Sequence, residues 1–366
     1  MDNIIIEKIL LYDVSFPLKK PYSLRNELIR SRDIIVVQVV TEQGTLGFGE
    51  AAPLPGLSPE PLKKVRHQLE LLAEDWKGRA LPARGTDLLT YLEKALDSAL
   101  FCHSVKFALE SAVLMASARV EGLIPCQLIT GKGPRAVQSA GLLQGSLPEV
   151  LEQARLQKTQ GVSVFNLKLG NRNVPLDIRK VEEVKALLGP TGVLRLDANR
   201  SWRFDEALLF AQNIGKNQIE YFEEPCAQND KWETLYRLTD IPLAADESLA
   251  LHNIEDLSGM HGLSCFVVKP TVWGGVTGCL SMLRLAKAAA KKVVISSAFE
   301  SGIGLTMLAN LAVLSGEVAD FGSFNWLAGD TLQEPLMTPS GIIPVPRLNL
   351  APEDLGAGLR GQLVTC

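Results

Sequence analysis

From about residue 138 onward, short apolar segments alternate with longer segments that are apolar on one side at helical spacing. The short segments predict buried strands and the longer ones predict amphipathic helices. Eight strands that alternate with helices favour a closed parallel barrel over an open doubly wound sheet. No Gly-x-Gly-x-x-Gly follows the first strand, which disfavours a dinucleotide-binding fold. We predict strands at 138–143, 164–169, 192–197, 219–222, 242–245, 265–269, 292–296 and 318–322, and helices at 147–160, 177–188, 203–214, 228–238, 252–259, 274–290 and 302–315.

The first 130 residues have a different pattern, which predicts antiparallel strands followed by helices. Strands are expected at 3–14 and 34–50, the second broken by a turn at 41–44. The polar segment Leu24–Arg32 predicts a loop, and Ser58 predicts the N-cap of a helix at 59–77. Further helices are expected at 88–100 and 104–120.

After Trp326 the alternation dissolves into a segment rich in Pro and Gly, which we expect to pack against the opening block. The predicted fold class is therefore α/β, a modified (β/α)7β TIM-type barrel with an α+β capping domain. The barrel is expected in residues 131–326. The capping domain is expected in residues 1–130 and is completed by residues 327–366.

Composition and charge argue against nucleic acid and membrane as partners of this protein. The 366 residues are 46% hydrophobic and carry a net charge of −4, which gives no basic patch for nucleic acid. No apolar run reaches the roughly 18 residues of a membrane span, and the first residues lack the basic region of a signal peptide. Six cysteines occur singly, which argues against a zinc site and fits a reducing cytosol. We expect a cytoplasmic monomer or homo-oligomer whose partner is a small molecule.

Charged residues end five consecutive strands of the predicted barrel: Lys168, Asp197, Glu223, Asp246 and Lys269. Successive members lie 23 to 29 residues apart, about one strand-helix unit. The carboxyl ends of barrel strands are where active sites are built, by residues from several strands. The spacing therefore predicts that the five side chains converge. The alternative is that the acids are helix caps and surface ion-pair partners.

The three carboxylates predict a metal site. At about 4 Å and an effective dielectric constant of about 20, each like-charged pair costs about 4 kcal/mol. Such a group needs a cation or raised pKa values. All the candidate ligands are carboxylate oxygens, and the four histidines share no metal-ligand spacing. Mg²⁺, with Mn²⁺ as the alternative, therefore fits better than Zn²⁺.

Lys168 and Lys269 flank the acidic strands and should lie on opposite sides of the metal. They could simply form ion pairs with the acids. A functional interpretation is that the cation and a neighbouring ammonium lower a lysine pKa until that lysine acts as a base. A metal and a base together suit proton abstraction next to a carboxylate, where positive charge stabilises the ene-diolate.

These strand-end residues, with their neighbours, resemble the enolase superfamily in its muconate-lactonising subgroup. Within the subgroup they are most similar to the o-succinylbenzoate synthase family, and the resemblance covers most of the chain. The segments that carry it are Leu24-Arg25, Arg32-Asp33, Leu54-Pro55-Gly56-Leu57-Ser58, Lys168, Arg195-Leu-Asp197-Ala-Asn199-Arg200, Phe222-Glu-Glu-Pro-Cys226, Asp246-Glu-Ser248, Lys269-Pro-Thr271, Ile295-Ser-Ser297 and Glu300-Ser301.

The resemblance implies a Mg²⁺-dependent dehydration of a cyclohexadiene carboxylate in menaquinone or phylloquinone biosynthesis. Lys168 would remove the α-proton and then protonate the departing hydroxide, and Lys269 would stabilise the enediolate. Loops 20–32 and 52–58 would close over the succinyl tail of the substrate. By the same resemblance the metal ligands are Asp197, Glu223 and Asp246, their outer partners are Glu224 and Glu247, and the substrate-binding residues are Asn166, Asn199, Ser296, Ser297 and Arg25.

One position departs from the family pattern. The family usually has Lys-x-Lys at the end of the second strand, and Asn166 replaces the first lysine here. Because Asn166 still donates hydrogen bonds but carries no charge, we expect an altered rate or pH profile with the chemistry retained.

Three alternatives remain open. An N-succinylamino acid racemase or dipeptide epimerase would use both lysines as bases, but the Asp-x-Asp usual in dipeptide epimerases is missing from Asp320-Phe-Gly-Ser-Phe-Asn325. A mandelate racemase-like enzyme would need a histidine where Ser296-Ser297 stands. A non-catalytic barrel that serves as a binding scaffold would be expected to have lost one of the five charged groups, and none is lost.

Overall fold

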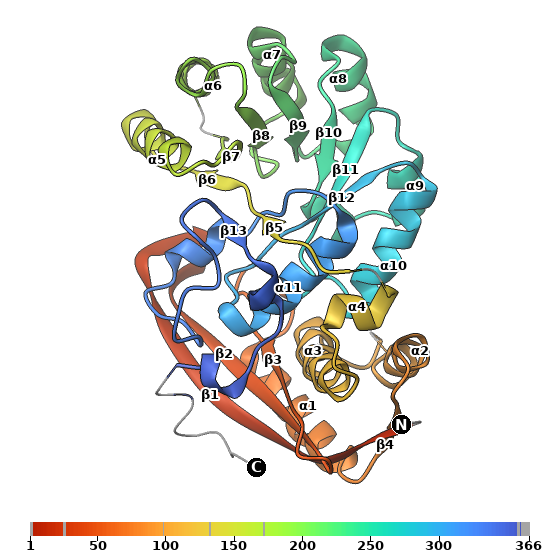
Figure 1. The fold of residues 1–366 in the computed structure, drawn as a ribbon. Helices are drawn as coiled ribbons and strands as arrows, with labels where there is room; N and C mark the ends of the chain where they lie inside the picture. The colour runs from red at the N-terminus through yellow and green to blue at the C-terminus, as the bar shows by residue number, and fades with distance from the viewer. Residues whose placement is uncertain are drawn as a thin grey trace.

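The computed structural model describes residues 3–24, 27–97, 99–131, 133–170, 173–356 and 359. Seven parallel strands form one curved sheet in the order β12-β11-β10-β9-β8-β7-β6, with helices along its outer face (Figure 1). This confirms the predicted α/β barrel class with a separate capping layer. The strands are β6 (Gly141–Leu143), β7 (Val164–Lys168), β8 (Val193–Asp197), β9 (Ile219–Glu223), β10 (Leu243–Ala245), β11 (Leu263–Val268) and β12 (Lys292–Ile295), and the helices are α5 (Leu147–Thr159), α6 (Val174–Leu188), α7 (Phe204–Ile214), α8 (Trp232–Thr239), α9 (Ile254–Gly259), α10 (Gly275–Ala288) and α11 (Gly302–Ser315).

The eighth strand is much shorter than predicted. Residues 318–322 form only two isolated bridges, Ala319 with Ser139 and Asp320 with Ser296. The chain then turns into a 3-10 helix over Gly322–Trp326, which ends the extended segment. The first predicted strand is also divided, because Val137–Gln138 (β5) pairs with β13 (Ile342–Ile343) in a separate small sheet.

The capping block is an antiparallel sheet in the order β3-β2-β1-β4, covered by helices. The predicted loop at Leu24–Arg32 is wrong, because β1 runs to Leu24 and β2 starts at Glu27, with Tyr22 opposite Ile29. Of the polar residues that the structure describes in this segment, Glu27 and Arg30 are exposed, while Arg32 is buried together with Ile29. The elements are β1 (Asn3–Leu24), β2 (Glu27–Thr41), β3 (Leu46–Ala51), β4 (Ala80–Pro82), α1 (Leu62–Asp75), α2 (Gly85–Ala95), α3 (His103–Val120) and α4 (Pro125–Thr130).

Ser58 is not the N-cap of α1. The helix begins at Leu62 after Pro61, whose ψ of 150° is extended. Pro59 and Pro61 each disfavour helical geometry in the residue before them, so the helix starts later than predicted. The Ser58 hydroxyl instead accepts a hydrogen bond from the Leu54 amide at 2.9 Å, which tightens the turn at 54–58.

The C-terminal segment contacts both parts of the molecule. Leu327 forms a bridge with Leu18 of β1, and Asn310 of α11 donates a side-chain hydrogen bond to the Leu348 carbonyl. These contacts agree with a tail that packs on the opening block, while the domain boundaries themselves stay a prediction. Among the residues described, no helix has the length and apolar character to cross a membrane.

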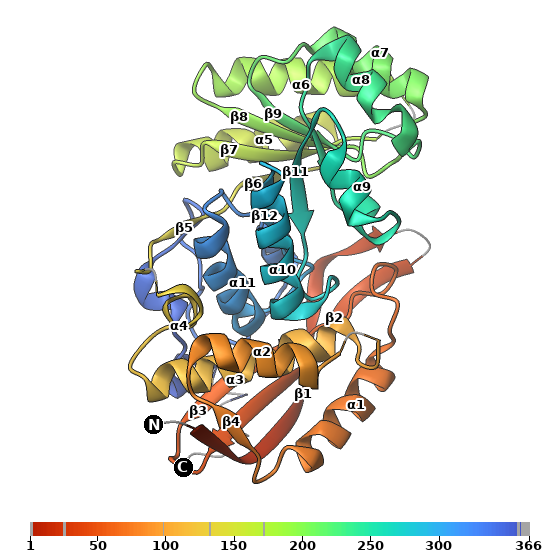
Figure 2. The ribbon, with the colours of Figure 1, turned by 90° about the vertical axis from the view of Figure 1, so that its right-hand side faces the viewer.

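Helix α3 lies between the cap sheet and the barrel helix α10 (Figure 2). It packs so closely on β3 that a Cβ added at Gly49 would lie 1.9 Å from the Ala108 carbonyl oxygen. Buried carboxylates also cross from the cap to the barrel, since Glu50 of β3 accepts hydrogen bonds at the start of α11 and Glu110 of α3 does so at the start of α10.

Substituting Gly49→Ala is expected to lower the free energy of unfolding by at least about 2 kcal/mol, because the added methyl overlaps backbone that cannot easily move. Gly259→Ala is the matched control, since no atom lies within 4 Å of a Cβ there. Denaturant unfolding should show the control within roughly 0.5 kcal/mol of the wild type. Equal effects from both substitutions would contradict this account of the β3–α3 contact.

Burial raises the pKa of Glu50 to about 7, and nearby Glu300 adds to the rise, while hydrogen bonds from Ser301 and Gly304 oppose it. Between about 4.5, the usual value, and 7 the folded state keeps a proton that the unfolded state has lost. The stability that this proton provides is present below pH 4.5 and is lost as the pH rises through 7. Between pH 4.5 and 7 the free energy of unfolding of the wild type should therefore fall with rising pH by on the order of 1 kcal/mol per pH unit more than that of Glu50→Gln. Urea unfolding from pH 5 to 8 would test this, with Glu74→Gln on the exposed face of α1 expected to keep the wild-type slope.

Candidate active site

The strand register brings the predicted residues to one edge of the barrel. Lys168 of β7 is the neighbour of Asp197 of β8, and Asp197 is the neighbour of Glu223 of β9. Asp246 and Lys269 directly follow the ends of β10 and β11. All five charged side chains therefore lie at the carboxyl end of the sheet, as their spacing predicts.

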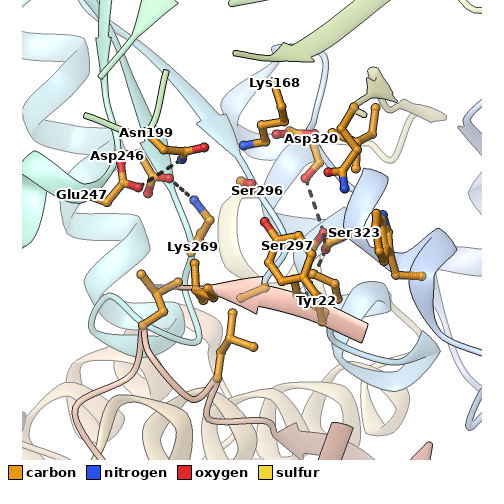
Figure 3. A pocket seen from close by; sticks show the side chains of 18 of the residues that line it. Tyr22, Lys168, Asn199, Asp246, Glu247, Lys269, Ser296, Ser297, Asp320 and Ser323 are labelled. Carbon is orange, nitrogen blue, oxygen red and sulfur yellow. Dashed lines mark hydrogen bonds and ion pairs between the residues drawn. The ribbon is translucent and has the colours of Figure 1, made fainter. Parts of the chain in front are cut away.

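Each lysine pairs with one of the carboxylates. The Lys168 amine donates to Asp197 Oδ2, and the Lys269 amine donates to Asp246 Oδ2. Figure 3 shows the amines directed into the same part of the pocket, from different sides. Glu223 is 1% exposed, and its Oε2 has no hydrogen-bond partner among the residues described. One oxygen of the buried Glu223 thus remains available for a further positive group.

Burial raises the pKa of Glu223 well above its usual value, and the charges of Asp197 and Asp246 raise it further. Burial lowers the pKa of both lysines, but the carboxylates outweigh it, so that the pKa of Lys168 and that of Lys269 are raised. The sequence predicted a lysine with a lowered pKa, but without a bound cation the pKa values of Lys168 and Lys269 are both raised. A divalent cation on the same carboxylates would reduce their effect on the amines.

In the described part of the chain, no three His, Cys, Asp or Glu side chains are gathered closely enough to form a ready-made metal cluster. The outer two carboxylates are drawn to the lysines instead. The donor chemistry nevertheless fits a hard cation, because the charges of Asp197 and Asp246 act on the buried Glu223, whose Oε2 has no hydrogen-bond partner among the residues described. Asp197, Glu223 and Asp246 are the residues that would hold Mg²⁺.

Further polar side chains hold the backbone and the acidic neighbours around these carboxylates. Glu224 accepts hydrogen bonds from the Asp246 amide at 2.9 Å and the Ser248 amide at 2.7 Å, and burial raises its pKa to about 8. Asn199 donates to Glu247 at 3.1 Å, so its amide group is already engaged. The φ angles of Asn199 and Glu224 are 43° and 44°, an unfavourable left-handed conformation that occurs at both strand ends.

The pocket is polar on one side and apolar on the opposite side. Ser296 and Ser297 line it as predicted, together with Lys168, Lys269 and Asn199. The apolar side includes aromatic and aliphatic side chains from the cap, from the loop after β12 and from the 3-10 helix Gly322–Trp326, which composition and spacing alone did not single out. They are Tyr22, Leu24, Leu54, Leu57, Phe299 and Trp326.

Of the predicted substrate-binding residues, Asn166 does not line the pocket. Asn166 is fully buried and donates to Asp320 Oδ2 at 2.7 Å, and it is Asp320 that lines the pocket. Arg25 lies outside the described residues. Sequence reasoning missed Asp320 and Ser323, although an acid at the end of the eighth strand is the same signal that identified the others.

Comparison with known proteins adds the family. A family model described as enolase C-terminal domain-like matches residues 149–359, and one described as the MenC N-terminal domain matches residues 6–113. The chain belongs to the enolase superfamily. The resemblance inferred from the strand-end residues is thereby confirmed, and so is the assignment of the chain as an enzyme of this superfamily.

Curated relatives include the o-succinylbenzoate synthase of Edwardsiella ictaluri, 32% identical over 82% of this chain and 85% of the relative. That of Pectobacterium atrosepticum is 31% identical over 89% of each chain. The muconate lactonizing enzyme of Pseudomonas fluorescens has a TM-score of 0.80 at 24% identity, covering 98% of each chain. The dipeptide epimerase of Enterococcus faecalis, solved with Mg and a dipeptide, has a TM-score of 0.81 at 21% identity, covering 94% of this chain and 97% of the epimerase. The two structural comparisons support the fold.

Mg²⁺ is expected to raise the thermal denaturation midpoint of the protein, because an ion that binds only the folded state stabilises it. Glu223→Gln should abolish most of this rise. The matched control is Asp320→Asn, which removes a charge from the same pocket without touching the three proposed ligands. A wild-type response in Glu223→Gln, measured by differential scanning calorimetry, would contradict the metal assignment.

Proposed function

We propose that the protein is an o-succinylbenzoate synthase. It would remove water from 2-succinyl-6-hydroxy-2,4-cyclohexadiene-1-carboxylate to form 2-succinylbenzoate, a step in menaquinone or phylloquinone biosynthesis in the cytoplasm. The observation that carries the proposal is the pair of amines, Lys168 and Lys269, that face one pocket beside three carboxylates. The curated relatives of that name, near 30% identity over most of the chain, support it.

The chain's own groups suit each part of this reaction. Lys168, in its neutral form, would take the proton from the carbon next to the substrate carboxylate and then return it to the departing hydroxide. The C–H and C–O bonds break, one water leaves, and the ring becomes aromatic. Lys269 would stay protonated and stabilise the negative charge that develops on the substrate. Mg²⁺ bound by the three carboxylates would supply further positive charge at the substrate carboxylate.

The pocket walls suit a substrate with a ring and polar ends. Tyr22 packs against Phe299 with ring centroids 5.1 Å apart and against Trp326 at 5.4 Å. These three rings, with Leu54 and Leu57, form an apolar wall opposite the charged strand ends. Ser296 and Ser297 offer hydroxyl groups for the polar tail. A closed wall of this kind also excludes water from the reacting carbon.

One observation favours the second candidate, a racemase or epimerase on the same scaffold. The Asp320 carboxylate lines the pocket and is held by Asn166. A carboxylate in this place can bind the ammonium group of a dipeptide substrate, whereas the acylated nitrogen of an N-succinylamino acid carries no charge, so the observation favours the epimerase. In that reaction both lysines would exchange protons with the α-carbon, from opposite faces.

The decisive experiment is an ultraviolet assay with the cyclohexadiene substrate and Mg²⁺. Lys168→Ala is expected to lower kcat by about 10² to 10⁴-fold, the usual contribution of a general base. Lys269→Ala should cause a loss of similar size through the missing positive charge. The matched control is Lys292→Ala, because Lys292 pairs with Glu220 and Glu317 at the other end of β12 and should leave kcat unchanged.

Activity that survives in both pocket variants would overturn the assignment of the two lysines. If the wild type instead exchanges the α-proton of N-succinylamino acids or dipeptides with deuterium and does not dehydrate the cyclohexadiene, the second candidate replaces the first. Failure of every substrate in the presence of Mg²⁺ would favour a non-catalytic scaffold.

A further inference from the structure

Two loops at the carboxyl edge of the barrel carry proposed active-site residues and then lead directly into helices. The first, residues 269–274, begins with Lys269 and ends at α10. The second, residues 296–301, begins with Ser296 and Ser297 and ends at α11. Each loop is therefore placed at one end by its strand and at the other by the first turn of its helix.

Neither helix caps its own first turn with a side chain. The N-cap of α10 is Gly274, which has no side chain, and that of α11 is Ser301, which makes no side-chain cap hydrogen bond. The first backbone N–H groups of a helix need an acceptor. Here the acceptors include a buried carboxylate from the capping block at each helix, joined at α11 by Asp330 and Thr331 of the C-terminal segment, which accept from the Gly302 amide at 2.7 Å and the Ile303 amide at 3.1 Å.

Glu110 of α3 serves the first helix. Its carboxylate accepts from the Val276 amide at 2.5 Å, the Thr277 amide at 3.1 Å and the Thr277 hydroxyl at 2.6 Å. The loop lies tightly on α3, because a Cβ added at Gly275 would be 2.5 Å from Glu110 Oε2. His103, at the start of α3, also contacts the Val272 carbonyl oxygen at 2.5 Å.

Glu50 of β3 serves the second helix. Its carboxylate accepts from the Ser301 amide at 2.8 Å, the Gly304 amide at 3.0 Å and the Ser301 hydroxyl. The two loops are also joined to each other, since the Thr271 hydroxyl donates to the buried Glu300 carboxylate. Loop 269–274 therefore leads directly into the residues held by Glu110, and Thr271 joins it to Glu300, the neighbour of the Ser301 that Glu50 holds.

We propose that Glu110 and Glu50 are positioning residues for catalysis, through which the cap sets the backbone of the loops that carry Lys269 and Ser296–Ser297. The proposal deepens the proposed function and rests on it for the roles of those residues. Neither carboxylate lines the pocket, so each acts through its loop. Misplacement of a reacting group by about 1 Å can cost on the order of 10²-fold in rate, which a shifted loop would cause.

The test compares Glu110→Ala and Glu110→Gln with Glu60→Ala. Glu60 makes the same type of contact, accepting from the Ser104 amide at 3.2 Å and the Ser104 hydroxyl at 2.8 Å, but entirely within the cap. Glu110→Ala is expected to lower kcat at least about tenfold with KM within about threefold of the wild type. Glu110→Gln keeps an acceptor oxygen and should restore kcat to within about threefold, and Glu60→Ala should keep wild-type kcat even where its loss of stability is equal.

Two further measurements separate positioning from stability. In a Lys269→Ala background, Glu110→Ala should cause no additional loss of kcat, because the two residues act through one group. Amide hydrogen exchange of the full-length protein without substrate should rise at residues 270–278 in Glu110→Ala and stay at the wild-type level in Glu60→Ala. The corresponding prediction for Glu50→Ala is faster exchange at residues 298–304.

The proposal is overturned if Glu110→Ala and Glu60→Ala of equal stability have the same kcat, or if exchange at 270–278 is unchanged in Glu110→Ala. If the wild type does not turn over the cyclohexadiene substrate, the proposed function fails by itself. Hydrogen exchange then decides whether the cap carboxylates hold the loops, since it requires no substrate.

Discussion

The repulsion among Asp197, Glu223 and Asp246 is the constraint on which the rest of the site depends. Carboxylates buried side by side at adjoining strand ends are stable only when positive charge compensates them. Lys168 and Lys269 supply that charge in the chain, and each does so from a strand that flanks the acids. The amines are therefore kept beside the three carboxylates proposed to bind Mg²⁺ by the ion pairs that compensate those carboxylates. The five side chains that balance one another's charge are thus the same five to which we assign the proposed chemistry.

The barrel and its charged edge could be predicted because both depend on simple periodicities. An apolar strand and an amphipathic helix recur with each unit, and a residue at the end of one strand is brought beside its counterpart on the next. Lys168, Asp197 and Glu223 are in register as neighbours for this reason. The helix α11 has the predicted bounds, because its apolar run ends at a glycine that takes a left-handed conformation.

Other features depend on contacts between distant segments and have no local signal. The strand at Glu27–Arg32 is rich in polar residues, and only its pairing with β1 and the burial of Ile29 and Arg32 explain it. Asn166 was expected to meet the substrate, but its partner is Asp320, 154 residues away in sequence. Glu110 caps α10 from another layer, and Glu50, with Asp330 and Thr331, caps α11, so inspection of either helix sequence does not reveal these acceptors.

Because the eighth strand is reduced to isolated bridges, the barrel has a weakly paired seam at residues 318–322, between β12 and the start of the sheet. Across it, backbone pairing is limited to Ala319 and Asp320, and side chains supplement that pairing. Arg195 reaches the Val318 carbonyl from inside the barrel at 2.9 Å, and Asn166 holds the Asp320 side chain. Local opening of the barrel should start where backbone hydrogen bonds between strands are fewest. In this structure that place is the segment at Ala319 and Asp320, beside the pocket. The hydrogen bond from the uncharged Asn166 amide to Asp320 then helps to hold the weakly paired segment in the barrel, so the residue that departs from the family pattern has a structural role here.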